Sequence, residues 1–186
     1  MEKEILLKVN DMCKTFGPTK AVDHVSMDIY PGEIRGLIGE NGSGKSTLTS
    51  MISGYLSKDS GTMQFAGAPY EPANMTQAIA AGISMIVQES GTIDGLNVAQ
   101  NIFLGNEGEF YSRGICNRKR MMQKARELLN QYKLSHIDPA EEVSRYDFEE
   151  RKMLELLKAM YSSPKLLIVD ETTTALSHKG RDVLYQ

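Results

Sequence analysis

Gly39-Glu40-Asn41-Gly42-Ser43-Gly44-Lys45-Ser46-Thr47 is the stretch of sequence that decides the fold. The apolar run 34–38 precedes it and the segment 48–52 follows it, so the predicted order is strand, glycine loop, helix. The three glycines let the backbone adopt positive φ and bring successive N–H groups close to phosphate oxygens. The helix N-terminus adds the positive end of its dipole. The stretch therefore predicts a phosphate-binding loop.

Two side chains of this loop have roles that depend on a bound phosphate. Lys45 is expected to reach the β- and γ-phosphates, and the hydroxyl of Ser46 to ligate Mg²⁺. The alternative is a glycine-rich turn before an ordinary helix. The complete G-x-x-x-x-G-K-S spacing, placed between a strand and a helix, favours a purine nucleoside triphosphate with Mg²⁺.

Length and charge limit the possible functions. The chain has 186 residues, which suggests a single domain with a sizeable core. It carries 21 Lys and Arg against 24 Asp and Glu, a net charge of −3, so nucleic acid is not a favoured partner. Apolar runs fall short of the roughly 18 residues that indicate a membrane helix, and the first residues do not resemble a signal peptide.

The cysteines and histidines show no metal-binding or catalytic spacing. Cys13 and Cys116 are expected to be reduced thiols of a cytosolic protein and to serve as small apolar side chains. His24, His136 and His178 have no motif around them and are expected at the surface or in packing contacts.

The hydrophobic pattern predicts strands alternating with helices. Predicted strands are 5–9, 25–29, 34–38, 62–65, 83–87 and 166–169. Predicted helices are 73–81, 97–104, 118–132 and 148–161, and 105–114 is expected to be an exposed loop. The expected buried positions of the last two helices are Met121, Ala125, Leu128, Leu129, Met153, Leu156, Leu157 and Met160, with Asn117 as an N-cap.

Polar side chains follow two of the buried strands. Gln88 comes directly after 83–87, and Asp170 and Glu171 follow 166–169. Open α/β sheets bind ligands at this carboxyl edge. Gln88 is therefore a candidate contact to Mg²⁺ or water, Asp170 a candidate Mg²⁺ ligand and Glu171 a candidate for orienting or deprotonating the attacking water. The alternatives are a solvated loop glutamine and a solvated strand end.

An aromatic residue stands in the turn 14–18. Phe16 could stack on a purine ring, although an aromatic side chain in a turn more often packs against the protein.

These pieces in this order resemble the nucleotide-binding domain of an ABC transporter over nearly the whole chain. In that family an aromatic A-loop residue stacks on adenine, a Walker A loop binds phosphates, a Q-loop glutamine follows, and Walker B ends in two acids. The matching residues are Phe16, 39–47, Gln88, and Asp170 with Glu171, and 174–177 stands in for the D-loop. The resemblance implies an α/β P-loop NTPase fold, with a RecA-like core around a parallel sheet, an N-terminal antiparallel β subdomain and an inserted helical subdomain.

The resemblance also implies a division of the chain, 1–186, into parts of one ABC ATPase domain. The antiparallel β subdomain and P-loop core are expected at 1–88, the Q-loop and helical subdomain at 89–163, and the Walker B strand and D-loop at 164–186. The family's switch histidine has no match before Gln186. The chain is therefore expected to be the front part of a longer protein, truncated before the last core strands.

Two segments are similar to importers of simple sugars such as ribose, galactose and xylose: 82–89 and 101–105. This resemblance implies an ATP-hydrolysing subunit that uses ATP and Mg²⁺, peripheral on the cytoplasmic face of the cell membrane. Its implied partners are permease subunits, a second ATPase domain as a homodimer or fused tandem, and indirectly a substrate-binding protein. Nucleoside importers carry related segments. The motifs also fit a non-hydrolysing regulatory module and a soluble ABC ATPase, and the acidic balance disfavours the soluble ATPase.

The sequence departs from the family at its signature motif. The family's Leu-Ser-Gly-Gly-Gln-like segment falls on Tyr146-Asp147-Phe148-Glu149-Glu150. Asp147-x-x-Glu150 forms a capping box that suits the helix. It does not suit ATP, because the carboxylates would repel the phosphates. Two like charges about 4 Å apart repel by roughly 4 kcal/mol at an effective dielectric constant of about 20. This repulsion outweighs the roughly 0.3–1 kcal/mol by which a helix dipole attracts an anion. The composite site completed by this helix is therefore expected to be weak or catalytically silent. Thr172 replaces the family's usual proline, a mild departure.

Overall fold

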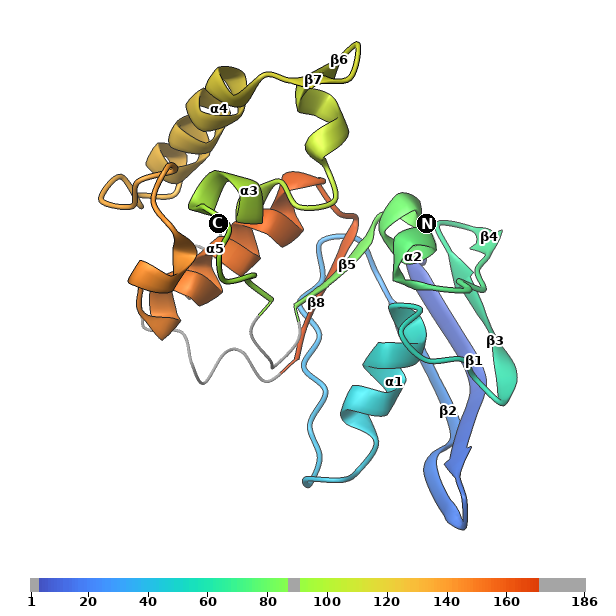
Figure 1. Ribbon diagram of the computed structural model, residues 1–186. Coiled ribbons are helices and arrows are strands. Elements are labelled where there is room, and N and C mark those ends of the chain that lie inside the picture. Colours follow the sequence, from blue (N-terminus) through green and yellow to red (C-terminus); the bar gives the residue numbers. More distant parts are fainter. Residues whose placement is uncertain (1–3, 87–90, 171–186) are drawn as a thin grey trace. The chain divides into compact units, whose positions relative to one another are not determined.

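The structure is a computed structural model that describes residues 4–86 and 91–170 (Figure 1). The chain forms two compact units, Met1–Ser84 and Met85–Gln186, and each is described by itself. The predicted residues Gln88, Glu171, Thr172 and His178 and the segment 174–177 lie outside the described residues.

An antiparallel sheet is the framework of the first unit. Its strands are β1 (Leu7–Phe16), β2 (Thr19–Ile29), β3 (Ser60–Phe65) and β4 (Ala68–Pro69), in the order β2-β1-β3-β4. Alternation along β1 and β3 buries Leu7, Val9, Met63 and Phe65, as expected for a sheet with one face on a core. The predicted N-terminal antiparallel subdomain is confirmed.

Two helices complete the first unit: α1 (Lys45–Ile52) and α2 (Met75–Ala81). Figure 1 shows α1 beside β2. The last carbonyl of α1, that of Ile52, accepts a hydrogen bond of 2.8 Å from the buried hydroxyl of Tyr70. Helix α2 ends at Gly82, which has φ +101°, so the predicted glycine stop is confirmed.

The segment before the glycine loop is not a strand. Residues 33–40 are irregular, and Ile34 and Ile38 are 79% and 99% exposed. A strand is stabilised by backbone hydrogen bonds to a neighbour, and within 4–86 and 91–170 no strand pairs with this segment. The prediction of a strand at 34–38 is therefore wrong for this structure.

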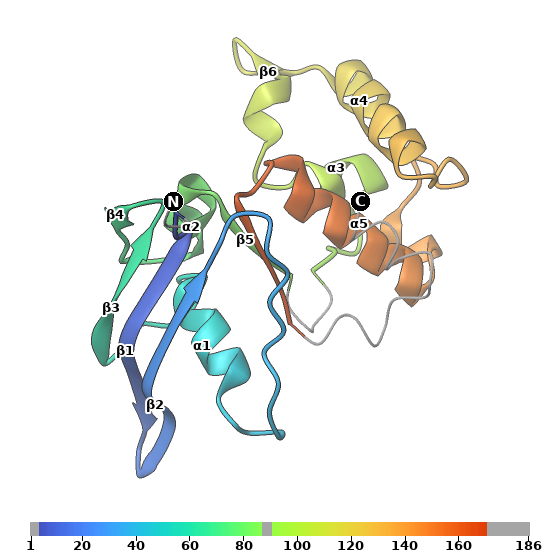
Figure 2. The same ribbon diagram turned by 180° about the vertical axis from the view of Figure 1, so that it is seen from behind.

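The second unit is mainly helical (Figure 2). Its elements, in chain order after β5 (Ile83–Ile86), are α3 (Val98–Ile102), η1 (Glu107–Phe110), β6 (Tyr111–Ser112), β7 (Ile115–Cys116), α4 (Arg118–Gln131), η2 (Val143–Arg145), α5 (Phe148–Tyr161) and β8 (Leu166–Val169). Strand β8 pairs with β5, and the N–H of Asp170 donates to the carbonyl of Ile86 at 3.1 Å.

Helices α4 and α5 confirm the helical predictions. The side chain of Asn117 caps α4 by accepting from the N–H of Arg120 at 3.0 Å. Most of the predicted inward positions are buried: Met121, Ala125, Leu129, Met153, Leu156 and Leu157. Leu128 and Met160 are only partly buried against the same core.

The segment 105–114 is more ordered than predicted. It contains η1 and the first strand of the β6–β7 hairpin, and Phe110 is 2% exposed. The reason is an aromatic cluster, because the ring of Phe103 lies 4.6 Å from that of Phe110 and 4.9 Å from that of Tyr161. Burial of an aromatic ring contributes enough apolar area to fix such a segment.

In the described part of the chain, no helix combines the length and the apolar character needed to cross a membrane.

Candidate functional site

The glycine loop is held against the antiparallel sheet at its last glycine. Gly44 has φ +88°, and a Cβ atom there would lie 2.0 Å from the carbonyl oxygen of Ala21 on β2. A Cβ at Gly39 would lie 2.5 Å from Oγ of Ser43, a side-chain atom that can rotate away, so Gly39 is less confined than Gly44. Because only glycine fits at position 44, the sequence fixes where the loop ends and α1 begins.

The N-terminus of α1 is free of negative charge. Its N-cap is Gly44, which makes no side-chain hydrogen bond to the helix, and its first turn contains no acidic residue. The first N–H groups of a helix have no intrahelical partner, and the helix dipole makes this end positive. Ser46 in this turn is exposed, and Lys45 is half-buried. This end of α1 is therefore suited to an anion.

Lys45 lies across the glycine loop. Its Nζ donates to the carbonyl oxygens of Gly39 at 2.9 Å and Glu40 at 2.8 Å. The ammonium thus adds a positive charge beside the helix N-terminus. The loop and the lysine thus bring positive charge to the start of α1, and the binding of a phosphate group there stays a prediction.

The hydroxyl of Thr49 supports the first turn from within. It donates to the carbonyl oxygens of Ser46 at 3.1 Å and Lys45 at 3.3 Å, and Thr49 is buried. The hydroxyl of Ser46 itself is on an exposed residue, and hydroxyl oxygen is the ligand type that Mg²⁺ prefers, so its assignment as a magnesium ligand stays a prediction.

Phe16 ends β1 at the β1–β2 hairpin, where it pairs with Thr19. Phe16 is 49% exposed, and Nζ of Lys14 lies 5.7 Å from the centroid of its ring. Lys14 is held by Asp59 at 2.7 Å, and this hydrogen bond, with one from the N–H of Thr15, lowers the pKa of Asp59. An exposed ring beside a fixed cation is compatible with stacking on a base, which stays a prediction.

Asp170 directly follows β8 in the second unit and is half-buried. Its backbone N–H is used in the pairing with Ile86. The carboxylate therefore follows a strand end, as predicted, and its assignment as a Mg²⁺ ligand stays a prediction.

Helix α5 begins with its own carboxylates on its first N–H groups. Asp147 accepts from the N–H of Glu150 at 2.8 Å, and Glu150 accepts from the N–H of Asp147 at 3.1 Å. Glu149 adds a further acid to the first turn. The predicted capping box is confirmed, and this helix N-terminus is unsuited to a second anion.

A family model for ABC transporters matches residues 22–174. The chain belongs to the ABC transporter family. This confirms the resemblance given by the sequence motifs, and the matched range includes the glycine loop and α1.

Known ABC proteins similar to this chain include sugar importers. The ribose import ATP-binding protein RbsA of Clostridium perfringens (strain SM101 / Type A) is 37% identical over 185 residues, covering 100% of this chain and 37% of that protein. The arabinose import ATP-binding protein AraG 1 of Burkholderia cenocepacia (strain HI2424) is 34% identical over 180 residues, covering 97% and 35%. The chain thus spans little more than a third of the length of these relatives.

Solved ABC structures share the fold. The structure of MJ1267, an ATP-binding cassette of an ABC transporter, has a TM-score of 0.82 and 27% identity, covering 97% of this chain and 75% of that one. The α/β P-loop NTPase fold predicted for this ABC chain is therefore confirmed.

Sequence reasoning missed a buried ion pair within α5. Lys152 and Glu155 are 2% and 6% exposed, and Nζ of Lys152 lies 2.8 Å from Oε2 of Glu155. The other oxygen of Glu155 accepts from the N–H of Gly91, shortly after the predicted Q-loop. The i,i+3 spacing of opposite charges was visible in the sequence, but such pairs usually lie in solvent.

Proposed function

We propose that this ABC chain binds and hydrolyses ATP to energise the import of a simple sugar. The observation that carries the proposal is the glycine loop, with Lys45 across it and no acidic residue in the first turn of α1. The named functions of the sugar-importing relatives support the choice of cargo. Import ATP-binding proteins named for ribose, arabinose and galactose are similarly identical to this chain, at 34–37%. The proposal therefore specifies the class of sugar only.

The proposed binding mode uses the loop residues 39–47. On nucleotide binding, Lys45 would exchange its two carbonyl partners for oxygens of the β- and γ-phosphates, while backbone N–H groups of the loop and of the first turn of α1 donate to the same phosphates. Phe16 would stack on adenine. Charge-assisted hydrogen bonds of this kind contribute about 1.5–3 kcal/mol each.

In the proposed hydrolysis, the residues that would hold a magnesium ion through oxygen atoms are Ser46, Gln88 and Asp170. The ion would neutralise charge that develops on the phosphates. Glu171 would orient or deprotonate the attacking water, with Gln88 and Lys45 completing the catalytic set. Phosphoryl transfer depends on positioning and charge stabilisation, which these groups supply.

The proposed partners are permease subunits and a second ATPase domain, either another copy or a fused tandem domain. A separate substrate-binding protein would deliver the sugar. The chain would work at the cytoplasmic face of the membrane by docking on the permease.

The decisive experiment measures nucleotide affinity after removal of the loop ammonium. Lys45→Ala should weaken Mg-ATP binding by roughly 30-fold, corresponding to about 2 kcal/mol, in a titration with fluorescent ATP. Lys20→Ala is the matched control, because Lys20 is a lysine of the same unit with an exposed side chain. Unchanged affinity in Lys45→Ala would overturn the proposal.

A second candidate function is a nucleotide-binding module without turnover. The acidic first turn of α5 favours it, since the carboxylates of Asp147 and Glu150 occupy the N–H groups there. In the full-length protein, Glu171→Gln distinguishes the two functions. Loss of ATP turnover with retained binding supports the ATPase, whereas turnover that is absent in both proteins supports the module.

A further inference from the structure

The pairing of β1 with β2 is irregular close to Cys13, Asp23 and His24, whose side chains are of the types that bind metal ions. Register shifts occur between Val9 and Met12 and between Met12 and Lys14. On the two sides of the irregularity, Asp11 and His24 both have φ +53°, a left-handed conformation that is uncommon outside glycine. Bulges of this type re-aim side chains. Here they bring Cys13 close to Asp23 and His24, which lie 10 and 11 positions later in the sequence.

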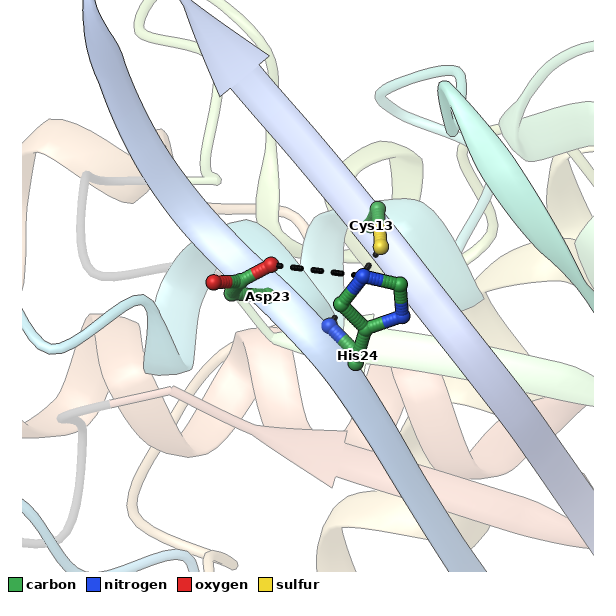
Figure 3. Close-up of side chains that lie close together, drawn as sticks. All are labelled: Cys13, Asp23 and His24. Carbon is green, nitrogen blue, oxygen red and sulfur yellow. Dashed lines mark hydrogen bonds and ion pairs between the residues drawn. The ribbon is translucent and has the colours of Figure 1, made fainter.

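Cys13, Asp23 and His24 form a compact cluster (Figure 3). One ligand atom from each residue, sulfur, carboxylate oxygen and ring nitrogen, lies within 4.8 Å of the other two. The sequence predicted no metal site from these residues, because the bulged pairing of β1 with β2 creates their proximity.

Asp11 determines which nitrogen of His24 is available. Its Oδ1 lies 2.7 Å from Nδ1 of His24, so the carboxylate accepts the Nδ1 proton. In the neutral imidazole, Nε2 then carries a lone pair. A carboxylate behind a histidine is the usual support of a metal-binding imidazole, fixing its tautomer and orientation.

The free side of His24 faces Asp23. Nε2 lies 3.7 Å from Oδ1 of Asp23, which is too long for a hydrogen bond. With metal–ligand distances of about 2.1 Å, two ligands at a tetrahedral angle are roughly 3.4 Å apart. The observed separation is close to that value, and Figure 3 shows this nitrogen between Asp23 and Cys13.

Cys13 supplies a sulfur that is already hydrogen-bonded. The backbone N–H of His24 donates to its Sγ at 3.3 Å. The same sulfur lies 3.8 Å from the carbonyl oxygen of Asp11. Metals bind a cysteine sulfur as the thiolate. Thiolate with imidazole suits zinc and similar ions, whereas Mg²⁺ and Ca²⁺ prefer oxygen ligands only.

Lys20 is the competing cation at this site. Its Nζ lies 3.3 Å from Oδ1 of Asp23, and both side chains are more than half exposed. Exposed pairs of this kind contribute about 0–1 kcal/mol. A divalent ion bound by three ligands can therefore displace the ammonium.

We propose that Cys13, Asp23 and His24 bind a zinc-class divalent cation, with Asp11 holding His24 in place and water completing the tetrahedron. The ion would join β1 to β2 beside the hairpin that carries Phe16. This site uses none of the residues assigned to nucleotide binding.

Cobalt is the probe, because tetrahedral Co²⁺ bound to thiolate absorbs strongly in the visible and near-ultraviolet range. The reduced full chain, free of nucleotide and Mg²⁺, is titrated with Co²⁺ and then with Zn²⁺. One equivalent of Co²⁺ should give thiolate charge-transfer absorption, and Zn²⁺ should remove it. Absence of this absorption in the wild-type chain would overturn the proposal.

Variants identify the ligands. Cys13→Ser should abolish the charge-transfer band, and His24→Asn, which tolerates positive φ, should weaken binding at least tenfold. Asp11→Asn should weaken it by roughly 10- to 100-fold, as for other supporting groups. Cys116→Ser and His136→Asn are matched controls from the second unit and should change nothing. A band that survives Cys13→Ser, or that disappears in Cys116→Ser, would contradict the assignment.

Discussion

The N-termini of α1 and α5 show two ways in which one fold treats the positive end of a helix. Helix α1 begins at Gly44 with no acidic residue in its first turn, and Lys45 adds a positive charge. Helix α5 begins with Asp147 and Glu150 bound to its own N–H groups. The first end is suited to an external anion, whereas the second is stabilised by the protein itself.

This difference shows that a helix dipole alone does not make a binding site. Each helix has unpaired backbone N–H groups at its start, and in each the N-terminus is the positive end of the dipole. The side chain at the N-cap decides between them, because glycine leaves the donors exposed and aspartate occupies one of them. In α1 the absence of a side chain thus leaves the first N–H groups open to an external anion, while in α5 the capping box stabilises the helix itself.

The largest expected effect concerns the body of α5. Lys152→Met should destabilise the chain by about 3–5 kcal/mol in urea unfolding, because it leaves the carboxylate of Glu155 buried without this partner. The double variant Lys152→Met/Glu155→Leu is the control and should recover most of the loss. A loss below about 1 kcal/mol in the single variant would mean that the pair is solvated in solution.

The next effect tests the glycine start of α1. Gly44→Ala should destabilise the first unit by at least about 2 kcal/mol, since a Cβ would lie 2.0 Å from the carbonyl oxygen of Ala21 and the left-handed backbone adds strain. Gly42→Ala is the matched control, because it also has positive φ but no atom within 4 Å. Equal losses in both variants would show that φ alone, rather than the contact with β2, fixes this position.

A smaller effect is expected when α5 is made to resemble α1. Asp147→Ser with Glu149→Gly removes two carboxylates while keeping an N-cap of similar strength. In the assembled transporter, ATP turnover at the site facing this helix should rise at least tenfold, because two of the carboxylates that repel the γ-phosphate are removed. Steady-state turnover with unchanged thermal stability is the readout. No gain in turnover would count against the idea that these acids silence the site.

The smallest effect concerns the far end of α1. Burial raises the pKa of Tyr70 to about 12, above its ordinary value of about 10. The folded state therefore holds this proton more tightly, so the resulting stability is complete below about pH 10 and is lost as the pH rises towards 12. Tyr70→Phe should cost about 1 kcal/mol at neutral pH, through loss of the bond to Ile52.

The dependence of stability on alkaline pH provides the control for Tyr70→Phe. The pKa of Tyr161 is also raised to about 12, first by burial and then by its hydrogen bond to Glu109. Tyr70→Phe should therefore reduce, but not remove, the loss of stability between pH 10 and 12, and Tyr161→Phe should reduce it separately. An unchanged slope in Tyr70→Phe would contradict the role given to burial.

Local patterns were sufficient to predict much of the fold. The glycine stop of α2, the periodic apolar residues of α4 and α5 and the capping box of α5 act within a few residues, and these elements were predicted correctly. The segment 34–38 was not, because its conformation depends on neighbouring strands rather than on its own apolar residues.

The sites follow the same distinction. The loop around Lys45 is contiguous in sequence, so its residues could be named before its geometry was known. The burial of Lys152 with Glu155, and the proximity of Cys13 to His24, depend on tertiary packing and on two bulges. Neither arises from a local pattern, and both therefore required the structure.

The contact between Gly44 and Ala21 has a consequence for anyone who alters the β1–β2 hairpin. Ala21 lies only two positions beyond Thr19, the first residue of β2. An insertion or deletion between them would replace the carbonyl beneath Gly44 with one that points to the opposite edge of the strand. Surface loops usually tolerate changes of length, but the length of the β1–β2 hairpin determines which carbonyl lies against Gly44 of the glycine loop. Grafts and fusions are therefore better placed at the β6–β7 hairpin.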